Sequence, residues 1–289
     1  MSDQGRYEQQ LQAVREVTDR MGRILLVMSG KGGVGKSSVA VNLAVSLAEE
    51  GHRVGLLDVD FHGPSVPRLL GLTGRRVVMG GDKMVPIRYS KRLKVLSMGN
   101  CVESADDAVV WRGPMKGAVI RQFVTDGAWG ELDFLVVDSP PGTGDEPMSV
   151  LQSMRGALAI IVTTPQQLSV DDVRRSISFC RILDTPVLGV IENMSGMACP
   201  HCGANIDLFG RGGGEQICKE MNVPFLGSIP IDPDLVAAGD AGHPITGAAP
   251  ASAAARAFAD IARRIETGAL PDSEETPASN GGKRKKVTT

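Results

Sequence analysis

Aromatic residues and histidines are scarce in this 289-residue sequence, and long apolar runs are missing. It contains two Trp, two Tyr, seven Phe and four His. Because no apolar run reaches about 18 residues, the sequence predicts no membrane-spanning helix and no membrane partner. The formal net charge is −2 and no basic stripe is present, so no nucleic-acid partner is expected. The polar N-terminal stretch MSDQGRYEQQLQ argues against a secretory signal, and we expect a cytoplasmic protein.

Cysteine is also sparse, with five residues in the chain: Cys101, Cys180, Cys199, Cys202 and Cys218. In a cytoplasmic protein these are expected to be thiols or metal ligands rather than disulfides. The four histidines have no ligand spacing such as H-x-x-x-H. By contrast, hydrophobic residues make up 42 % of the chain and glycine is abundant. This composition is typical of an α/β protein with a sizeable core.

Apolar runs of strand length alternate with helical patterns along most of the chain. The expected strands are 24–28, 53–58, 94–98, 134–138, 157–163, 187–192 and 225–229, and the expected helices are 39–48, 115–129, 170–183 and 251–266. This alternation predicts an α/β fold, a mostly parallel twisted sheet with helices on both faces, in a single domain over 23–268. Residues 1–22 are expected to form a polar helical extension. The tail 269–289, which ends in KRKK, is expected to be disordered, with at most a weak attraction to anionic surfaces.

Three further stretches have weaker patterns. Residues 60–67 are too rich in Gly and Pro for regular structure, and residues 73–94 have a hairpin-like character. The run GRGGGE at 210–215 looks like a phosphate-binding loop but lacks a lysine and a preceding strand. We therefore expect a loop and the start of a helix there.

The most informative motif is GKGGVGKSS, residues 30–38, which fits the P-loop pattern G-x-x-x-x-G-K-[ST]. The strand-like run before it and the helical pattern after it are the context that a P-loop needs; a flexible glycine linker is the alternative. Backbone N–H groups of such a loop point at phosphate oxygens, and the helix start adds its dipole. We predict an ATP site in which Lys36 binds the β- and γ-phosphates and Ser37 binds Mg²⁺. The predicted nucleotide-binding residues are Gly30, Lys31, Gly32, Gly33, Val34, Gly35, Lys36, Ser37 and Ser38.

Carboxylates end two of the expected strands. Asp138 follows an apolar strand, in the Walker B position that holds Mg²⁺, and the turn PPGTG at 140–144 is expected to sense the γ-phosphate. Asp58 and Asp60 end the second strand as D-V-D. We predict that Asp60 orients the attacking water and that Asp58 supports the Mg²⁺ shell. The alternatives are an ordinary strand-to-turn aspartate at 138 and a solvated acidic strand end at 58–60.

The second organising motif is C-P-H-C, from Cys199 to Cys202. Two thiolates at this spacing can bind one metal centre from a tight loop, but zinc or a [4Fe–4S] cluster takes four ligands. The partner subunit of a two-fold dimer would supply the other two. A structural zinc, a surface dithiol and a thioredoxin-like redox motif are the alternatives. The redox motif normally follows the first strand of its fold, whereas here the motif comes late.

Taken together, the motifs resemble those of the Mrp/ApbC (Nbp-like) iron–sulfur cluster carriers, which are deviant-Walker-A ATPases of the MinD/ParA-like (SIMIBI) class. The matching segments are KGGVGKSS, DVDFHGPSVP, DSPPGTGDE, ENMSGMACPHC and GSIPIDP. The resemblance implies a homodimer in which Lys31 reaches the phosphates of the partner subunit. It also implies that Asn193, with Pro230 and Asp232 beside it, contacts the adenine base. By the same resemblance, Cys199 and Cys202 of two subunits bridge a labile [4Fe–4S] cluster.

These expectations describe a slow ATPase that receives a cluster from an assembly scaffold and passes it to apo iron–sulfur proteins. ATP with Mg²⁺ would favour one dimer arrangement, and hydrolysis would release it. Two alternatives from other classes stay open. A MinD/ParA-like positioning ATPase would act on a membrane or DNA surface through a basic amphipathic helix or a basic face. A nitrogenase-type reductase would draw its cluster cysteines from elsewhere in the chain, where Cys101 alone is a thin basis.

Overall fold

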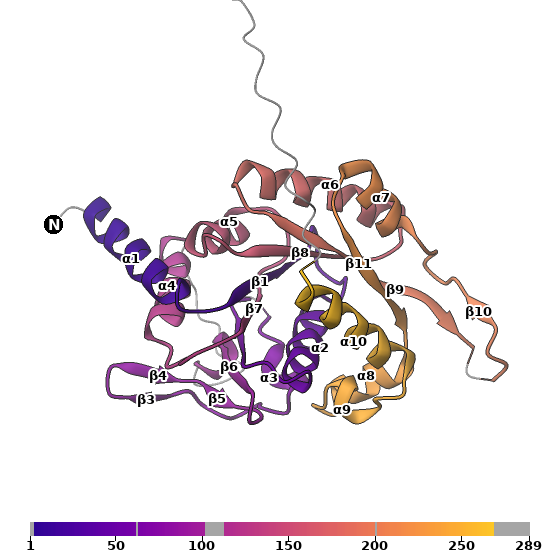
Figure 1. The fold of residues 1–289 in the computed structure, drawn as a ribbon, viewed down its shortest axis with the longest axis horizontal. Helices are drawn as coiled ribbons and strands as arrows, with labels where there is room; N and C mark the ends of the chain where they lie inside the picture. The colour runs from indigo at the N-terminus through magenta and orange to yellow at the C-terminus, as the bar shows by residue number, and fades with distance from the viewer. Residues whose placement is uncertain (1–2, 62, 102–112, 200, 269–289) are drawn as a thin grey trace, which may run out of the picture.

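The computed structural model describes residues 3–61, 63–101, 113–199 and 201–268. Over these residues, nine strands form one mostly parallel sheet in the order β10-β9-β8-β1-β7-β2-β6-β5, with β11 paired to β9 (Figure 1). The strands are β1 Arg23–Met28, β2 Val54–Asp58, β5 Ile87–Arg88, β6 Leu93–Ser97, β7 Phe134–Asp138, β8 Leu158–Thr163, β9 Val187–Ala198, β10 Asn205–Ile206 and β11 Phe225–Ile231. A separate hairpin of β3 Val78–Gly80 and β4 Lys83–Val85 confirms the hairpin expected in 73–94.

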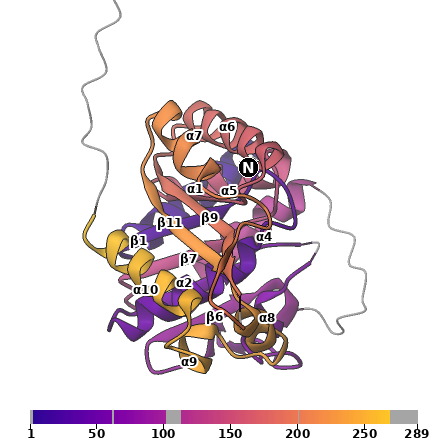
Figure 2. The same cartoon turned by 90° about the vertical axis from the view of Figure 1, so that its right-hand side faces the viewer.

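Helices cover both faces of the sheet, which confirms the predicted fold class (Figures 1 and 2). One face is covered by α2 Lys36–Glu49, α3 Val66–Leu69, α8 Pro233–Asp240, α9 Ile245–Ala248 and α10 Ala253–Glu266. The other face is covered by α1 Asp3–Thr18, α4 Gly113–Asp126, α5 Asp145–Ser153, α6 Gln167–Ile182 and α7 Gly213–Met221. No described helix has the length and apolar character needed to span a membrane.

The central strands are buried on both sides, which explains their continuous apolar sequences. In β1, Leu25 and Val27 belong to the core beneath α2 and α10, whereas Ile24 and Leu26 belong to the core beneath α4 and α5. Two-sided burial of this kind is typical of parallel strands between two helical layers. α2 is buried along most of its length, because the sheet, α10, α3 and α9 all pack against it.

The N-terminal helix α1 is attached through its one apolar stripe. Val14 is 1 % exposed and lies in the core shared with α4, and Val17 packs against the same core. The helix expected in residues 1–22 therefore contacts the sheet domain through α4. The predicted tail 269–289 with its KRKK end lies outside the described residues.

The structure departs from the predicted elements chiefly in the second half of the chain. β9 does not end at 192 but runs to Ala198, because β11 and β10 continue its hydrogen-bond ladder past the apolar part. The sequence pattern does not reveal α5, α8 and α9. In the first half, α3 begins at Val66, inside the stretch expected to be irregular. The run at 210–215 forms a loop and the start of α7, as predicted.

Candidate functional site

The predicted P-loop and the predicted strand-end carboxylates lie at one edge of the sheet. β1, β2 and β7 are neighbouring parallel strands, and their register pairs Asp138 with both Val27 and Asp58. Open α/β sheets bind their ligands at the carboxyl ends of parallel strands. The fold therefore brings residues 30–38, 58–60 and 138 to one place.

The P-loop backbone has the conformation that its glycines permit. Gly33 and Gly35 both have a φ of 82°, in the left-handed region that favours glycine. The turn is fixed to the strand before it, because the Ser29 hydroxyl donates to the Lys31 carbonyl at 2.8 Å. Gly35 caps α2, and no side chain of the described residues caps this helix N-terminus. Its backbone N–H groups are therefore available to an anion.

Lys36 lies among the predicted carboxylates rather than in solvent. Its side chain is 6 % exposed, and its Nζ lies 2.5 Å from Asp138 Oδ1 and 3.9 Å from Asp60 Oδ2. The same Nζ lies 3.3 Å from the hydroxyl oxygen of Ser37. The structure thus brings together the lysine, the hydroxyl and two of the carboxylates that the sequence predicts for phosphate and Mg²⁺ chemistry.

Asp58 is buried directly beside this cluster. Its carboxylate accepts hydrogen bonds from Ser97 Oγ at 2.7 Å and from the Asp60 backbone N–H at 3.1 Å. Burial, together with repulsion from Asp138, raises the pKa of Asp58 to about 8. Burial also raises the pKa of Asp138, although Lys36 opposes this shift. The site thus holds more buried carboxyl groups than the single Lys36 ammonium can neutralise.

The cluster offers hard oxygen ligands of the kind that Mg²⁺ prefers. Asp138 Oδ2 is buried and has no hydrogen-bond partner among the described residues, although buried polar atoms are normally paired. The Ser37 hydroxyl lies close enough to lower the pKa of Asp138, and Asp58 is its neighbour on the adjacent strand. These residues fit a Mg²⁺ ion held by Ser37 and Asp138, with Asp58 in support.

Lys31 and Asn193 contribute to the P-loop in different ways. Lys31 is half-buried and makes no ion pair or side-chain hydrogen bond within the described part of the chain. Asn193 Nδ2 donates to the Val34 carbonyl at 2.9 Å, and a Cβ on Gly35 would lie 2.3 Å from that nitrogen. The sequence predicts that Asn193 follows the end of the strand 187–192, but this prediction is wrong, because Asn193 lies in the middle of β9 and supports the P-loop backbone. Its contact with adenine stays a prediction.

The two residues expected beside the adenine lie at the end of β11. Pro230 follows the β11 residue that pairs with Asn193. The Asp232 carboxylate accepts hydrogen bonds from the backbone N–H groups of Asp234 and Ala254, at 3.0 and 3.2 Å. It therefore caps α8 and holds the start of α10, a role that sequence reasoning missed. Contact of either residue with a base stays a prediction.

The two motif cysteines lie on a hairpin that projects from the sheet (Figure 1). β9 and β10 pair antiparallel, and the Cys199 N–H donates to the Ala204 carbonyl at 2.8 Å. Hydrogen bonds from the backbone N–H of Cys202, and then of His201, lower the pKa of Cys199, which favours the thiolate that binds metals. Among the described residues, no third His, Cys, Asp or Glu joins the cysteines to form a metal site. The hairpin therefore offers a pair of thiolates and leaves a four-ligand centre half complete.

Sequence reasoning missed three polar side chains around these sites. Ser97 donates to a predicted carboxylate from the neighbouring strand. Lys116 of α4 pairs with Glu146 at the start of α5, and its Nζ lies 5.5 Å from the centroid of the Phe61 ring. Neither residue has a local sequence signal, because its partner is distant in the chain. The third, Glu192, had one: a charged residue at the end of an apolar strand needs a partner if it is buried.

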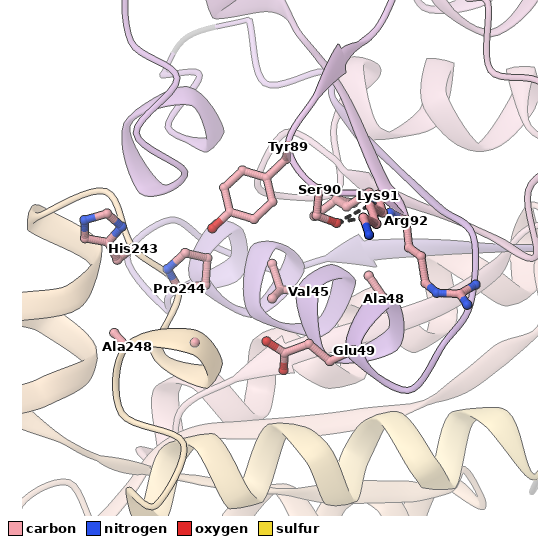
Figure 3. Close-up of a pocket in the computed structure, with 12 residues that line it drawn as sticks. Val45, Ala48, Glu49, Tyr89, Ser90, Lys91, Arg92, His243, Pro244 and Ala248 are labelled. Atoms are coloured by element: carbon pink, nitrogen blue, oxygen red, sulfur yellow. Dashed lines mark hydrogen bonds between the residues drawn. The ribbon is translucent and has the colours of Figure 1, made fainter.

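A separate pocket of about 540 Å³ lies at the other end of α2 (Figure 3). Its lining includes Glu49 on the last turn of α2, the Tyr89 ring and His243. Burial raises the pKa of Glu49. The pocket shares no residue with the P-loop or with the cysteine hairpin, so it is not part of the predicted nucleotide site.

Comparison with known proteins shows that this chain is similar to members of one family. The sequence profile of ParA, described as NUBPL iron-transfer P-loop NTPase, matches residues 20–266. The human protein named cytosolic Fe-S cluster assembly factor NUBP2 is 49 % identical over 247 residues, which cover 84 % of this chain and 91 % of the human one. The Eremothecium gossypii protein named cytosolic Fe-S cluster assembly factor CFD1 is 49 % identical over 221 residues, covering 74 % and 79 %.

Solved structures support the same assignment. A nucleotide-binding protein from Archaeoglobus fulgidus, solved in complex with ADP, has a TM-score of 0.72 at 39 % identity and covers 80 % of this chain and 91 % of its own. The MinD cell division protein of Aquifex aeolicus has a TM-score of 0.63 at 25 % identity, covering 86 % and 99 %. The profile spans the P-loop, both carboxylate strands and the cysteine hairpin. The chain therefore belongs to the ParA family, as a NUBPL-type iron-transfer P-loop NTPase.

Proposed function

We propose that this protein is an ATP-hydrolysing carrier that holds a [4Fe–4S] cluster, as cargo, between two copies of the chain and passes it to apo iron–sulfur proteins. The observation that carries the proposal is the projecting hairpin with Cys199 and Cys202. Each chain offers two thiolates there, and a [4Fe–4S] cluster takes four. The names of the human and Eremothecium gossypii relatives support a role in cytosolic cluster assembly, and we place this chain in the same compartment.

Binding and hydrolysis of ATP at the nucleotide site switch the dimer between two arrangements. Lys36 binds the β- and γ-phosphates, and the backbone of residues 30–38 surrounds them. Ser37 and Asp138 would hold Mg²⁺ with support from Asp58, and Lys36 would leave its ion pair with Asp138 to contact the phosphates. Asp60, 3.9 Å from Lys36 Nζ, orients the water that attacks the γ-phosphate.

The remaining roles complete the homodimer. Lys31 reaches the phosphates of the partner subunit, which is consistent with an ammonium that has no partner within the described part of its own chain. Asn193, Pro230 and Asp232 border the adenine. A cluster-assembly scaffold loads the cargo, and apo iron–sulfur proteins accept it.

The alternative, a MinD/ParA-like ATPase that positions itself on a membrane or DNA surface, has less support. An amphipathic C-terminal helix would have to offer its apolar face to lipid. In α10, that face is buried against the sheet and α2 through residues such as Phe258 and Ile261. On the same helix, Arg263 pairs with Asp260, so this arginine adds no unpaired positive charge to a basic face.

Anaerobic reconstitution with iron and sulfide tests the carrier. The native chain is expected to bind about four irons per dimer, and Cys199→Ala/Cys202→Ala is expected to lose them while still binding ADP. Cys101→Ala, which removes an exposed cysteine outside the hairpin, is the matched control and should load as the native chain does. Iron content, absorbance and dimer mass are the readouts. Equal loading of the double variant and the native chain would disprove the proposal.

A further inference from the structure

Glu192 is a buried carboxylate that neither the nucleotide site nor the cysteine pair uses directly. It is 0 % exposed in β9, where its backbone pairs with Thr163 of β8 and Ser228 of β11. A charged group in such a position is unfavourable unless hydrogen bonds replace its hydration. The hydrogen-bond donors around Glu192 therefore indicate its structural role.

Three donors converge on the Glu192 carboxylate. Oε1 accepts from Ser195 Oγ at 2.5 Å and from the Gly212 N–H at 2.9 Å, and Oε2 accepts from the Gly214 N–H at 2.6 Å. Gly212 has a φ of 83°, and a Cβ on Gly214 would lie 3.1 Å from Oε2. The glycine run at 210–215 is thus an anion-binding turn at the start of α7 whose anion is a carboxylate of the same chain.

This contact closes the base of the cysteine hairpin. Residues 192 and 212 are the two ends of the segment that contains the outer half of β9, β10, Cys199 and Cys202. Within the segment, turn hydrogen bonds hold Cys199 to Ala204 and Gly203, but they fix only the hairpin tip. The Glu192 contacts hold the two ends of the segment, in β9 and at the start of α7, to each other.

The next residue in β9 connects the same strand to the nucleotide site. Asn193 Nδ2 donates to the Val34 carbonyl of the P-loop at 2.9 Å. Successive residues of a strand point to opposite faces. Glu192 therefore binds the α7 turn on one face of the sheet while Asn193 binds the P-loop on the other.

We propose that Glu192 is a positioning residue that fixes the base of the cysteine hairpin and thereby sets how tightly the Cys199–Cys202 pair binds metal. The inference rests on the proposed function, since it gives the hairpin's metal affinity its purpose. Glu192 acts through the backbone of Gly212 and Gly214 and touches no metal itself. Groups that hydrogen-bond directly to a metal ligand typically change metal affinity by about 10- to 100-fold, and we expect an effect in this range from Glu192 acting through the hairpin backbone.

Glu192→Gln tests this role with little change of shape. The amide nitrogen cannot accept a hydrogen bond from a glycine N–H, so one contact turns from attraction into repulsion. With Co²⁺ alone as the probe, thiolate-to-cobalt absorption measures affinity. The variant is expected to bind Co²⁺ about 10- to 100-fold more weakly than the native chain. Glu215→Gln, on the exposed first turn of α7, is the matched control and should bind as the native chain does.

Hydrogen exchange separates positioning from loss of the fold. In Glu192→Gln, amides of residues 195–199, 201–206 and 212–214 should exchange faster, whereas amides of β1 and β7 should keep their protection. Faster exchange throughout the sheet would mean that the variant fails to fold well. Ser195→Ala, which removes one donor and keeps the carboxylate, then takes over as the test and should weaken Co²⁺ binding a few-fold.

The outcomes separate this inference from the proposed function. If Cys199→Ala/Cys202→Ala binds Co²⁺ as tightly as the native chain does, the carrier proposal fails. The exchange data then still test whether Glu192 holds the hairpin in place. If binding depends on the cysteines but neither Glu192→Gln nor Ser195→Ala weakens it, the positioning role is overturned and the carrier proposal stands. Unchanged exchange at 195–206 in Glu192→Gln would also overturn it.

Discussion

The buried carboxyl of Asp58 should make the stability of the nucleotide-free protein depend on pH. The pKa of Asp58 is about 8 in the folded protein and 3.8 when unperturbed. As pH rises, the unfolded chain therefore releases this proton first. Stability is therefore lost from about pH 4 to about pH 8, with a slope on the order of 1 kcal/mol per pH unit. Asp58→Asn should flatten this slope and raise stability at pH 8. Urea unfolding with EDTA at pH 5, 6, 7 and 8 measures both.

The control for this variant is Asp82→Asn, an exposed aspartate in the β3–β4 turn. It should keep the native slope. If Asp58→Asn and the native chain lose stability equally between pH 5 and 8, Asp58 is ionised in both states over this range. The buried site would then be neutralised in some other way than by protonation of this carboxyl.

At the scale of residues, the sequence predicted which motif residues lie together better than it predicted the residues that support them. The P-loop, Asp60 and Asp138 form local motifs, and the fold brings them to Lys36. Ser97 and Lys116 belong to no such motif, because each interacts with a partner that only folding brings close. The two halves of the Glu192 contact were both visible, as a charge in an apolar strand and as a glycine run. Nothing in the sequence joined them.

At the scale of elements, α10 behaves as a core helix. Its apolar face, which includes Phe258 at 1 % exposure, packs on α2 and β11. Phe258→Ala should lower the free energy of unfolding by about 3–5 kcal/mol, through lost burial and the cavity left behind. Urea unfolding measures this change. Ala257→Gly, half-buried on the same helix, gives the smaller loss of about 1 kcal/mol expected from helix propensity.

A helix that detached to lie on a membrane would give another result. Phe258→Ala would then leave the unfolding free energy nearly unchanged and reduce co-sedimentation with liposomes. That pair of observations would revive the positioning ATPase. A large loss of stability with no liposome binding by the native chain would rule out α10 as an anchor.

Elements buried on both sides were easier to predict than elements that are not. β1, β7 and β8 are short, apolar and central, so their sequences alone mark them as strands. β9 was cut short because its outer half, ENMSGMA, is polar and owes its strand conformation to pairing with β11 and β10. α8 was missed because it begins with Pro233 after a capping aspartate and has only eight residues.

At the scale of the whole molecule, Lys31 should matter only when two copies meet. Lys31→Ala is expected to lower ATP turnover by on the order of 100-fold or more, as loss of a charge supplied in trans does in other P-loop enzymes. The affinity of the single chain for ADP should change much less. Phosphate release and the dimer mass with ATP are the measurements. Lys91→Ala, an exposed lysine at the far end of α2, is the control.

Unchanged turnover and dimer mass in Lys31→Ala would place this lysine outside the reaction. Reduced turnover with an unchanged dimer would mean that Lys31 acts on the phosphates but does not hold the subunits together. Loss of both is the result that the proposed homodimer requires.

If the proposed function holds, the half-complete ligand set on the hairpin has a consequence for where cargo can be kept. Two thiolates per chain make loading second order in protein, so the loaded fraction falls on dilution even when no client is present. Retention of the cluster then depends on the concentration of the chain. A tenfold drop in that concentration lowers the loaded fraction, as weaker ligands would. A cell that makes few copies of such a chain would hand its clusters over readily, and one that makes many would store them.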